Sequence, residues 1–266
     1  MDAELERAIR LRGLEVLHAD VGDQLLSKRL DSPGQIEHLY KLLHRYSFRL
    51  FLRDLLENQP VVPFELLTRY CSAAAAKRYL KTLEKFQIVR TEANGDTHFL
   101  LPVVPNFGET LEWYLAQIFR KELNLPASFR VVLKNGLVGG DYDVLALAGQ
   151  KLLYVEVKSS PPKAVDNQQV KNFLSRLRDL LPDLAFFFED THLRMKDKIV
   201  RLFEGELTRR YGWLASEKFP VARLKDELFH INHRIYIVNS KRGILHNMLT
   251  CFRDHLVFEL KSRGMP

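Results

Sequence analysis

The sequence predicts an α/β protein with a mixed sheet flanked by helices, preceded by a smaller, mainly helical domain. Two runs of elements lead to this prediction. Residues 35–104 show three helical patterns and a hairpin signal, whereas residues 105–266 show the order helix, three strands, helix and strand. Residues 1–34 are expected to form a helical lead-in. A chain of 266 residues is long enough for two domains.

The composition restricts the class of protein. With 46% hydrophobic and 27% charged residues, the chain resembles a folded globular protein and not a disordered one. Two cysteines, Cys71 and Cys251, are too few for a disulfide framework or a cysteine-rich zinc site. The first residues lack the order of a signal peptide, and no apolar run reaches the roughly 18 residues of a membrane span. These features predict a cytoplasmic protein without a membrane partner. The net charge of +7 is compatible with a nucleic-acid partner.

Helical periodicity and turn signals divide residues 35–104. Apolar residues at helical spacing predict one helix over 36–56, which Asn58-Gln59-Pro60 ends because proline disfavours a helical residue before it. A short helix is expected at Pro63, and Ser72 is expected to cap the helix that follows it. Asn94-Gly95 between two strand-like runs predicts a β-hairpin.

Three helices followed by a hairpin is the order of elements in winged helix-turn-helix domains, and this region resembles that family. In that family the third helix often enters the major groove and the hairpin contacts the backbone. The resemblance implies that cationic side chains of the third helix and the hairpin bind nucleic acid; these are Lys77, Arg78, Lys81, Lys85 and Arg90. For the individual lysines, solvated charges are the simpler interpretation. For the module as a whole, nucleic-acid and protein partners fit the sequence equally well.

A segment rich in proline and glycine, residues 101–108, predicts a linker, and the pattern changes beyond it. Apolar periodicity predicts helices and strands in alternation along the rest of the chain. We expect helices over 109–123, 164–181, 195–211 and 244–260, and strands over 129–133, 141–148, 151–158, 184–188 and 234–238.

The second and third of these strands carry the most informative side chains. The two-residue connection 149–150 makes these strands antiparallel neighbours. Pairing about that turn sets Val144 opposite Val155 and brings Asp143 close to Glu156, so that the two carboxylates converge.

Lys158 shares a strand face with Glu156, because side chains alternate along a strand. Two acids and a lysine are costly to bury unless they are paired or bind a metal. Carboxylate oxygens suit Mg²⁺ or Mn²⁺, and such an ion can activate water and stabilise charge during cleavage of a phosphodiester. A neighbouring ammonium group can orient that water.

Asp143, Glu156 and Lys158 together resemble the motif of the PD-(D/E)XK nuclease superfamily, and within it the branch of Holliday-junction resolvases and restriction endonucleases. The resemblance covers about residues 107–180 and implies a restriction-endonuclease-like fold. It implies that Asp143 and Glu156 ligate Mg²⁺ or Mn²⁺ together with the carbonyl of Val157. It also implies that Lys158 positions or activates water.

The resemblance extends to side chains outside the two strands. An acid on the leading helix would complete the site, and Glu112 matches it better than Glu109. Some branches add a glutamine on the helix after the lysine, for which Gln168 and Gln169 both qualify. Asp141 competes with Asp143 for the metal, although the residues after Asp143 match the resolvase-like pattern better.

His230 and His233 are the second candidate for a metal site, since on a helix a spacing of three residues would place both on one side. No acidic or cysteine partner is evident near them in the sequence, which favours a structural or surface role.

These observations predict a metal-dependent deoxyribonuclease with Mg²⁺ or Mn²⁺ as cofactor and DNA as partner, an endonuclease being favoured over an exonuclease. Two alternatives stay open: a catalytically silent nucleic-acid-binding or regulatory protein, and a protein-interaction or assembly factor. The resemblance also allows a homodimer.

Overall fold

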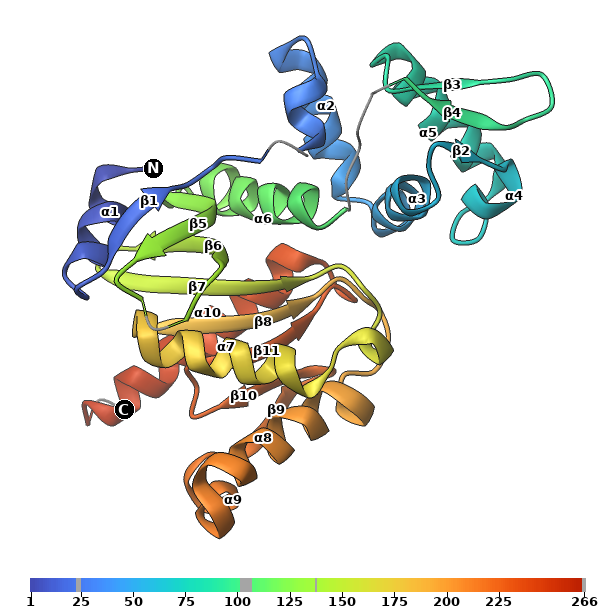
Figure 1. Ribbon diagram of the computed structural model, residues 1–266. Helices are drawn as coiled ribbons and strands as arrows, with labels where there is room; N and C mark the ends of the chain where they lie inside the picture. The colour runs from blue at the N-terminus through green and yellow to red at the C-terminus, as the bar shows by residue number, and fades with distance from the viewer. Residues whose placement is uncertain (23–24, 101–106, 137, 265–266) are drawn as a thin grey trace. The chain divides into compact units, whose positions relative to one another are not determined.

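The structure, a computed structural model, describes residues 1–22, 25–100, 107–136 and 138–264 (Figure 1). The chain divides into two compact units. One comprises Met1–Val21 and Leu115–Pro266, and the other comprises Gly22–Tyr114. Helix α6 (Gly108–Glu122) contains the point at which the second unit ends and the first resumes.

A mixed sheet of eight strands forms the centre of the larger unit (Figure 1). Its strand order is β1-β5-β6-β7-β8-β11-β10-β9, with parallel pairing of β7 with β8 and of β8 with β11, and antiparallel pairing elsewhere. The strands are β1 (Glu15–His18), β5 (Ala127–Lys134), β6 (Asp141–Ala148), β7 (Lys151–Lys158), β8 (Leu184–Glu189), β9 (Val221–Lys225), β10 (Leu228–Ile231) and β11 (Ile235–Asn239). The predicted α/β class with a mixed sheet is therefore confirmed.

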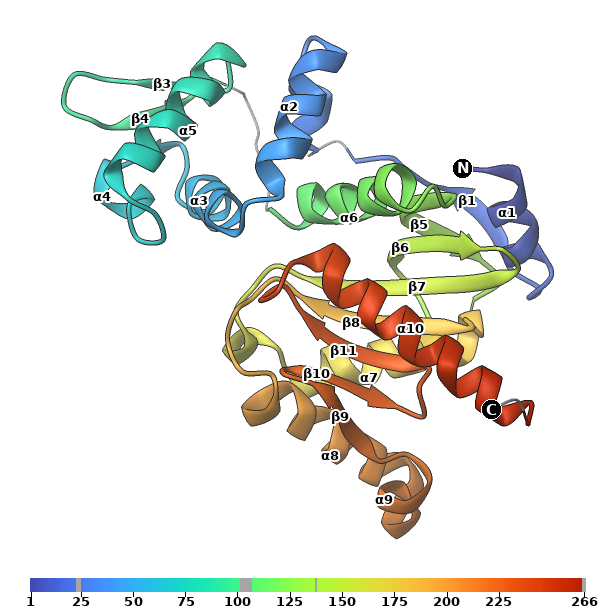
Figure 2. The same cartoon turned by 180° about the vertical axis from the view of Figure 1, so that it is seen from behind.

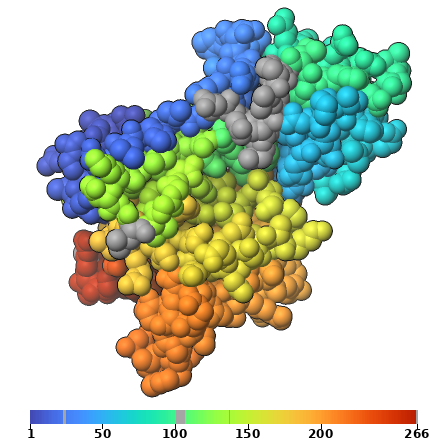
Figure 3. All heavy atoms as spheres, viewed as in Figure 1, coloured from blue at the N-terminus to red at the C-terminus, as the bar shows by residue number. Residues whose placement is uncertain are grey.

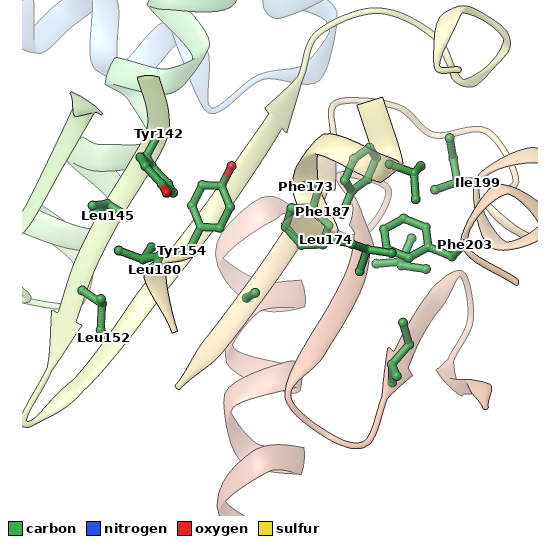
Figure 4. Packing of buried hydrophobic residues seen from close by; sticks show 14 of the residues in the cluster. Tyr142, Leu145, Leu152, Tyr154, Phe173, Leu174, Leu180, Phe187, Ile199 and Phe203 are labelled. Atoms are coloured by element: carbon green, nitrogen blue, oxygen red, sulfur yellow. The ribbon is translucent and has the colours of Figure 1, made fainter. Parts of the chain in front are cut away.

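Helices cover both faces of this sheet (Figures 1 and 2). Helices α1 (Ala3–Arg10), α7 (Asn167–Leu180) and α8 (Arg201–Tyr211) contribute to one apolar core with side chains of the sheet. Figure 4 shows part of this core, in which the Phe173 ring of α7 lies 5.4 Å from that of Phe187. Helix α10 (Ile244–Ser262) packs on the opposite face. The central strand β8 is buried along its whole length, which explains its continuous apolar sequence.

The first residues do not form the helical lead-in that we expected over residues 1–34. Helix α1 is followed by strand β1, which pairs with β5 through Glu15↔Lys134 and Val16↔Leu133. Figure 3 shows this segment, in blue, lying against the green of the sheet edge. Asp20 anchors its end, because its carboxylate accepts a hydrogen bond of 2.9 Å from Arg120. The strand depends on a partner that is distant in the sequence, so local periodicity does not reveal it.

Among its described residues, the smaller unit has four α-helices ahead of the hairpin, where the resemblance implies three. It contains α2 (Pro33–Leu43), α3 (Tyr46–Glu57), α4 (Phe64–Leu67), α5 (Ala73–Lys85) and a three-stranded sheet of β2 (Val61–Val62), β3 (Val89–Thr91) and β4 (Thr97–Phe99) in the order β2-β4-β3. The Ser72 cap is confirmed, since its hydroxyl accepts a bond from the Ala75 amide. The hairpin is confirmed too, with Gly95 in its turn at a φ of 93°.

The smaller unit differs from the prediction in its first helix. The single helix expected over 36–56 is two helices, separated at His44-Arg45, where the Arg49 guanidinium donates to the Leu43 carbonyl at 2.7 Å. Apolar spacing continues across this break, which hides it in the sequence. Most of the expected linker, residues 101–106, lies outside the described residues. None of the helices that the structure describes combines the length and apolarity needed to span a bilayer.

Candidate functional site

The site begins where β6 and β7 separate. The pairs Ala148↔Lys151 and Val144↔Val155 have the register that the turn predicts. Beyond Val144 a side chain replaces a backbone carbonyl as the hydrogen-bond acceptor, because the Val157 amide donates to Oδ2 of Asp143 at 2.6 Å. Asp143 is thereby held next to Glu156, and these two carboxylates are 9% and 3% exposed.

Glu156 lies between two cations. Lys158 Nζ donates to Oε1 at 2.6 Å, and Arg176 from α7 donates to Oε2 at 3.0 Å. The Tyr154 hydroxyl also donates to Oε2. Burial opposes the charged carboxylate, but the charges of Lys158 and Arg176 outweigh it and lower the pKa of Glu156. In return, Glu156 and Asp143 raise the pKa of Lys158 against its own burial. Glu156 and Lys158 are therefore a charged pair.

The pKa of Asp143 is shifted in the opposite direction to that of Glu156. Burial, followed by the nearby charge of Glu156, raises the pKa of Asp143 to about 8, despite the opposing effects of Lys158, Arg176 and the Val157 amide. At neutral pH this shift favours the protonated form of Asp143. A divalent cation could replace that proton, because a second positive charge would remove the repulsion between the carboxylates. Within the described part of the chain, Asp143 accepts its hydrogen bond through Oδ2. Oδ1 is therefore the oxygen better suited to ligate an ion.

Three other candidates are engaged elsewhere. Asp141 accepts a bond from Arg130 Nε at 3.2 Å, on the side of β6 that faces β5. Gln169 closes a capping box with Asp166 at the start of α7, and Gln168 bonds to Asn172. The glutamine contribution stays a prediction, while Arg176 of α7 contacts Glu156 directly.

The leading-helix acids belong to the other unit. Glu109 and Glu112 both lie on the part of α6 that belongs to Gly22–Tyr114. Their role at the site stays a prediction.

The predicted nucleic-acid-binding residues lie on the surface of the smaller unit. Lys77, Arg78, Lys81 and Lys85 are exposed on α5. Arg78, Lys81 and Lys85 follow helical spacing and share one side of the helix. Arg90 on β3 is exposed and lies 3.6 Å from a carboxylate oxygen of Glu92. Their binding role stays a prediction.

Three side chains around the predicted acids were not predicted from the sequence: Arg176, Tyr154 and Glu189. Glu189 is fully buried and is the register partner of Lys158 across β7 and β8. Both of its oxygens lack a hydrogen-bond partner within the described part of the chain. Burial, followed by Asp190, raises the pKa of Glu189 to about 8, although Lys158 opposes the shift. An acid directly after an apolar strand is the signal that could have identified it.

The second candidate, His230 and His233, does not lie on a helix. His230 is on β10 and His233 is in the following turn. Their acidic partner is Asp254 of α10, whose Oδ2 lies 2.7 Å from His233 Nδ1. The expected lack of an acidic partner is therefore wrong, because the fold brings in a residue from a later helix.

Comparison with known proteins bears on the fold. No protein-family model matches the chain, and no curated protein matches it. Among solved structures, the chain is similar to protein VC1899 from Vibrio cholerae, with 20% identity and a TM-score of 0.53 over 94% of this chain and 62% of that one. It is also similar to Can2 from Sulfobacillus thermosulfidooxidans, solved with cyclic tetra-adenylate, with 13% identity and a TM-score of 0.44 over 69% of this chain and 51% of that one. The chain thus spans less than two thirds of either protein. The likeness to VC1899 is a likeness of fold.

Proposed function

We propose that this protein is a divalent-metal-dependent nuclease that hydrolyses DNA phosphodiester bonds, with a restriction-endonuclease-like fold in its larger unit. The observation that carries the proposal is the grouping of Asp143, Glu156 and Lys158 at the point where β6 and β7 separate. Two buried carboxylates lie there beside an ammonium group, 2.6 Å from one of them. Burial of two acids is unfavourable without compensating charge, and a divalent ion would complete that compensation.

Each group has a distinct role in this proposal. Mg²⁺ or Mn²⁺, when bound, polarises the phosphate and lowers the pKa of a water. Asp143 and Glu156 offer the oxygen ligands, together with the carbonyl of Val157. Lys158 orients the attacking water and stabilises the negative charge that develops on the phosphate. Arg176 positions Glu156 by holding Oε2.

A cleavage assay tests the proposal. The full chain is incubated with supercoiled plasmid, linear duplex, single-stranded DNA and RNA, each with Mg²⁺, Mn²⁺ or a chelator. We expect cleavage of DNA with either metal and none with the chelator. Cleavage that persists in the chelator, or that is absent from every DNA substrate with both metals, contradicts the proposal.

The raised pKa of Asp143 predicts a pH dependence. The metal must displace a proton that Asp143 retains up to a pH of about 8. Between pH 6 and about 8, Mn²⁺ affinity should therefore rise by about tenfold per pH unit, and then level off. Titration calorimetry at fixed ionic strength measures this slope. In Asp143→Asn the slope should disappear along with most of the affinity, whereas an unchanged slope would assign the proton to another group.

One observation favours a second candidate function. Glu156 already accepts bonds from three side chains, which is also what a purely structural ion cluster would show. In that case the protein would be a catalytically silent nucleic-acid-binding or regulatory protein. Salt-dependent DNA binding without cleavage under any divalent metal would support this second function.

The α5 cations make a separate prediction about DNA affinity. Each side chain that neutralises one phosphate contributes about 0.9 to the slope of log affinity against log salt concentration. We expect Arg78→Ala and Lys81→Ala each to reduce the slope by about that amount, measured by fluorescence anisotropy on a duplex. Lys41→Ala, an exposed cation of α2 in the same unit, is the control and should leave the slope unchanged. Equal slopes for all three variants would remove α5 from the DNA interface.

A further inference from the structure

A group of three potential metal ligands lies at the hairpin of β10 and β11. It consists of His230, His233 and Asp254, whose ligand atoms all lie within 4.8 Å of one another. His230 is buried, while the other two are partly exposed. Within the described part of the chain this is the one group of three histidine, cysteine or acidic side chains at such distances.

The backbone of the hairpin turn brings the two imidazoles together. Asn232 and His233 have φ values of 52° and 54°, in the left-handed region that residues other than glycine adopt infrequently. This conformation folds the His233 ring back onto that of His230, with centroids 3.9 Å apart and planes 27° from parallel. The Asn232 side chain donates to the Lys218 carbonyl at 3.0 Å and secures the turn. Two histidines thus meet because the turn holds an unfavourable conformation.

Neighbouring side chains fix the orientation of the group. The Tyr236 hydroxyl lies 2.8 Å from Asp254 Oδ2 and 3.0 Å from the His233 carbonyl oxygen. His255 Nδ1 donates to the same carbonyl at 2.8 Å. Ligands of bound metals are oriented by outer hydrogen bonds of this kind. The group is therefore held in place by its surroundings on three elements: β10, β11 and α10.

We propose that His230, His233 and Asp254 form a binding site for a first-row transition metal, with Zn²⁺ as the ion that fits best. Two imidazoles and one carboxylate favour Zn²⁺ over Mg²⁺ or Ca²⁺, which prefer oxygen ligands alone. Around tetrahedral Zn²⁺ the ligand atoms lie about 3.3 Å apart, so side-chain rotations suffice to bring these three into place. Three protein ligands leave a fourth position for water or a substrate. The site uses none of the residues of the proposed nuclease centre.

The test is Zn²⁺ titration of the full chain carrying Asp143→Asn, which weakens metal binding at the other carboxylate site. We expect one equivalent of Zn²⁺ to bind and to raise the melting temperature. His233→Ala and Asp254→Asn should each lower the Zn²⁺ affinity by about 100-fold or more, since the loss of an outer hydrogen bond alone lowers affinity by about 10–100-fold. Asp254→Asn keeps an oxygen to accept from Tyr236, so the fold of the hairpin should be retained.

Controls separate this site from other metal binding. His246→Ala removes an exposed histidine of the same helix and should leave the affinity unchanged. Co²⁺ in place of Zn²⁺ should give the visible absorption of a tetrahedral site, and His230→Ala should remove that absorption. Failure to bind one equivalent of Zn²⁺, or a Zn²⁺ affinity of the His233 and Asp254 variants equal to that of the wild type, overturns the proposal.

Discussion

Asp143→Asn is expected to lower kcat/KM for metal-dependent DNA cleavage by at least about 100-fold without destabilising the protein. The amide oxygen of asparagine can still accept the bond from the Val157 amide, so the separation of β6 and β7 is preserved. What disappears is the negative charge on the oxygen that would face the metal. A cleavage assay at saturating Mn²⁺, together with urea unfolding, measures both effects.

The stability of the same variant should also depend on pH differently from that of the wild type. Because burial and Glu156 raise the pKa of Asp143 to about 8 in the folded protein, the folded state binds more protons than the unfolded state from about pH 4 to 8. The unfolding free energy of the wild type should therefore fall as pH rises through this window. Asparagine does not titrate, so the unfolding free energy of Asp143→Asn should fall less steeply with pH. Near pH 8 it should match or exceed that of the wild type.

The control for Asp143→Asn is Asp141→Asn. Asp141 lies two residues away on the same strand and pairs with Arg130. Cleavage by this control should change by less than about threefold, as for a surface ion pair. If Asp141→Asn instead abolishes cleavage while Asp143→Asn does not, the metal role belongs to Asp141, which competes with Asp143 for it.

Glu156→Ala should have a large effect on stability, unlike Asp143→Asn. It removes the partner of Lys158 and Arg176, both of which are largely buried. A buried charge left without its partner destabilises a protein by about 3–5 kcal/mol. We therefore expect the free energy of unfolding, measured by urea denaturation, to fall by about that amount, together with a loss of cleavage.

A second substitution tests the cause of this destabilisation. Adding Arg176→Leu to Glu156→Ala removes one unpaired cation, and the double variant should recover part of the lost stability. Glu6→Ala is the control, because it removes a surface partner of Arg10 and should change stability by no more than about 0.5 kcal/mol. A loss under about 1 kcal/mol for Glu156→Ala would show that the ion cluster contributes little to the fold.

Local sequence signals were sufficient for the centre of the larger unit. The two-residue turn at 149–150 predicts the register of β6 and β7, and Val144↔Val155 confirms it. The apolar run of β8 predicts a buried strand, because a parallel strand covered on both faces has no exposed side for polar residues. These predictions succeed because turn chemistry and hydrophobic periodicity act between residues close together in the chain.

Predictions that needed distant contacts failed. Strand β1 is short and exists through its pairing with β5. Strands β9 and β10 have five and four residues, and β9 is incompletely buried, so neither shows a strong alternating pattern. Asp254 is unremarkable on its own helix and acquires a role only beside His233.

The sequence alone determined the α/β class, the hairpin that carries Asp143 and Glu156, and the proposal of a metal-dependent nuclease. Only the tertiary structure decided that Arg176 reaches Glu156, that Glu189 is buried beside Lys158, and that Asp254 joins two histidines. The reason is physical: period and turn chemistry specify which way a side chain points from its own element. Its neighbours depend on how separate elements pack, and that packing is settled by the burial of the whole core.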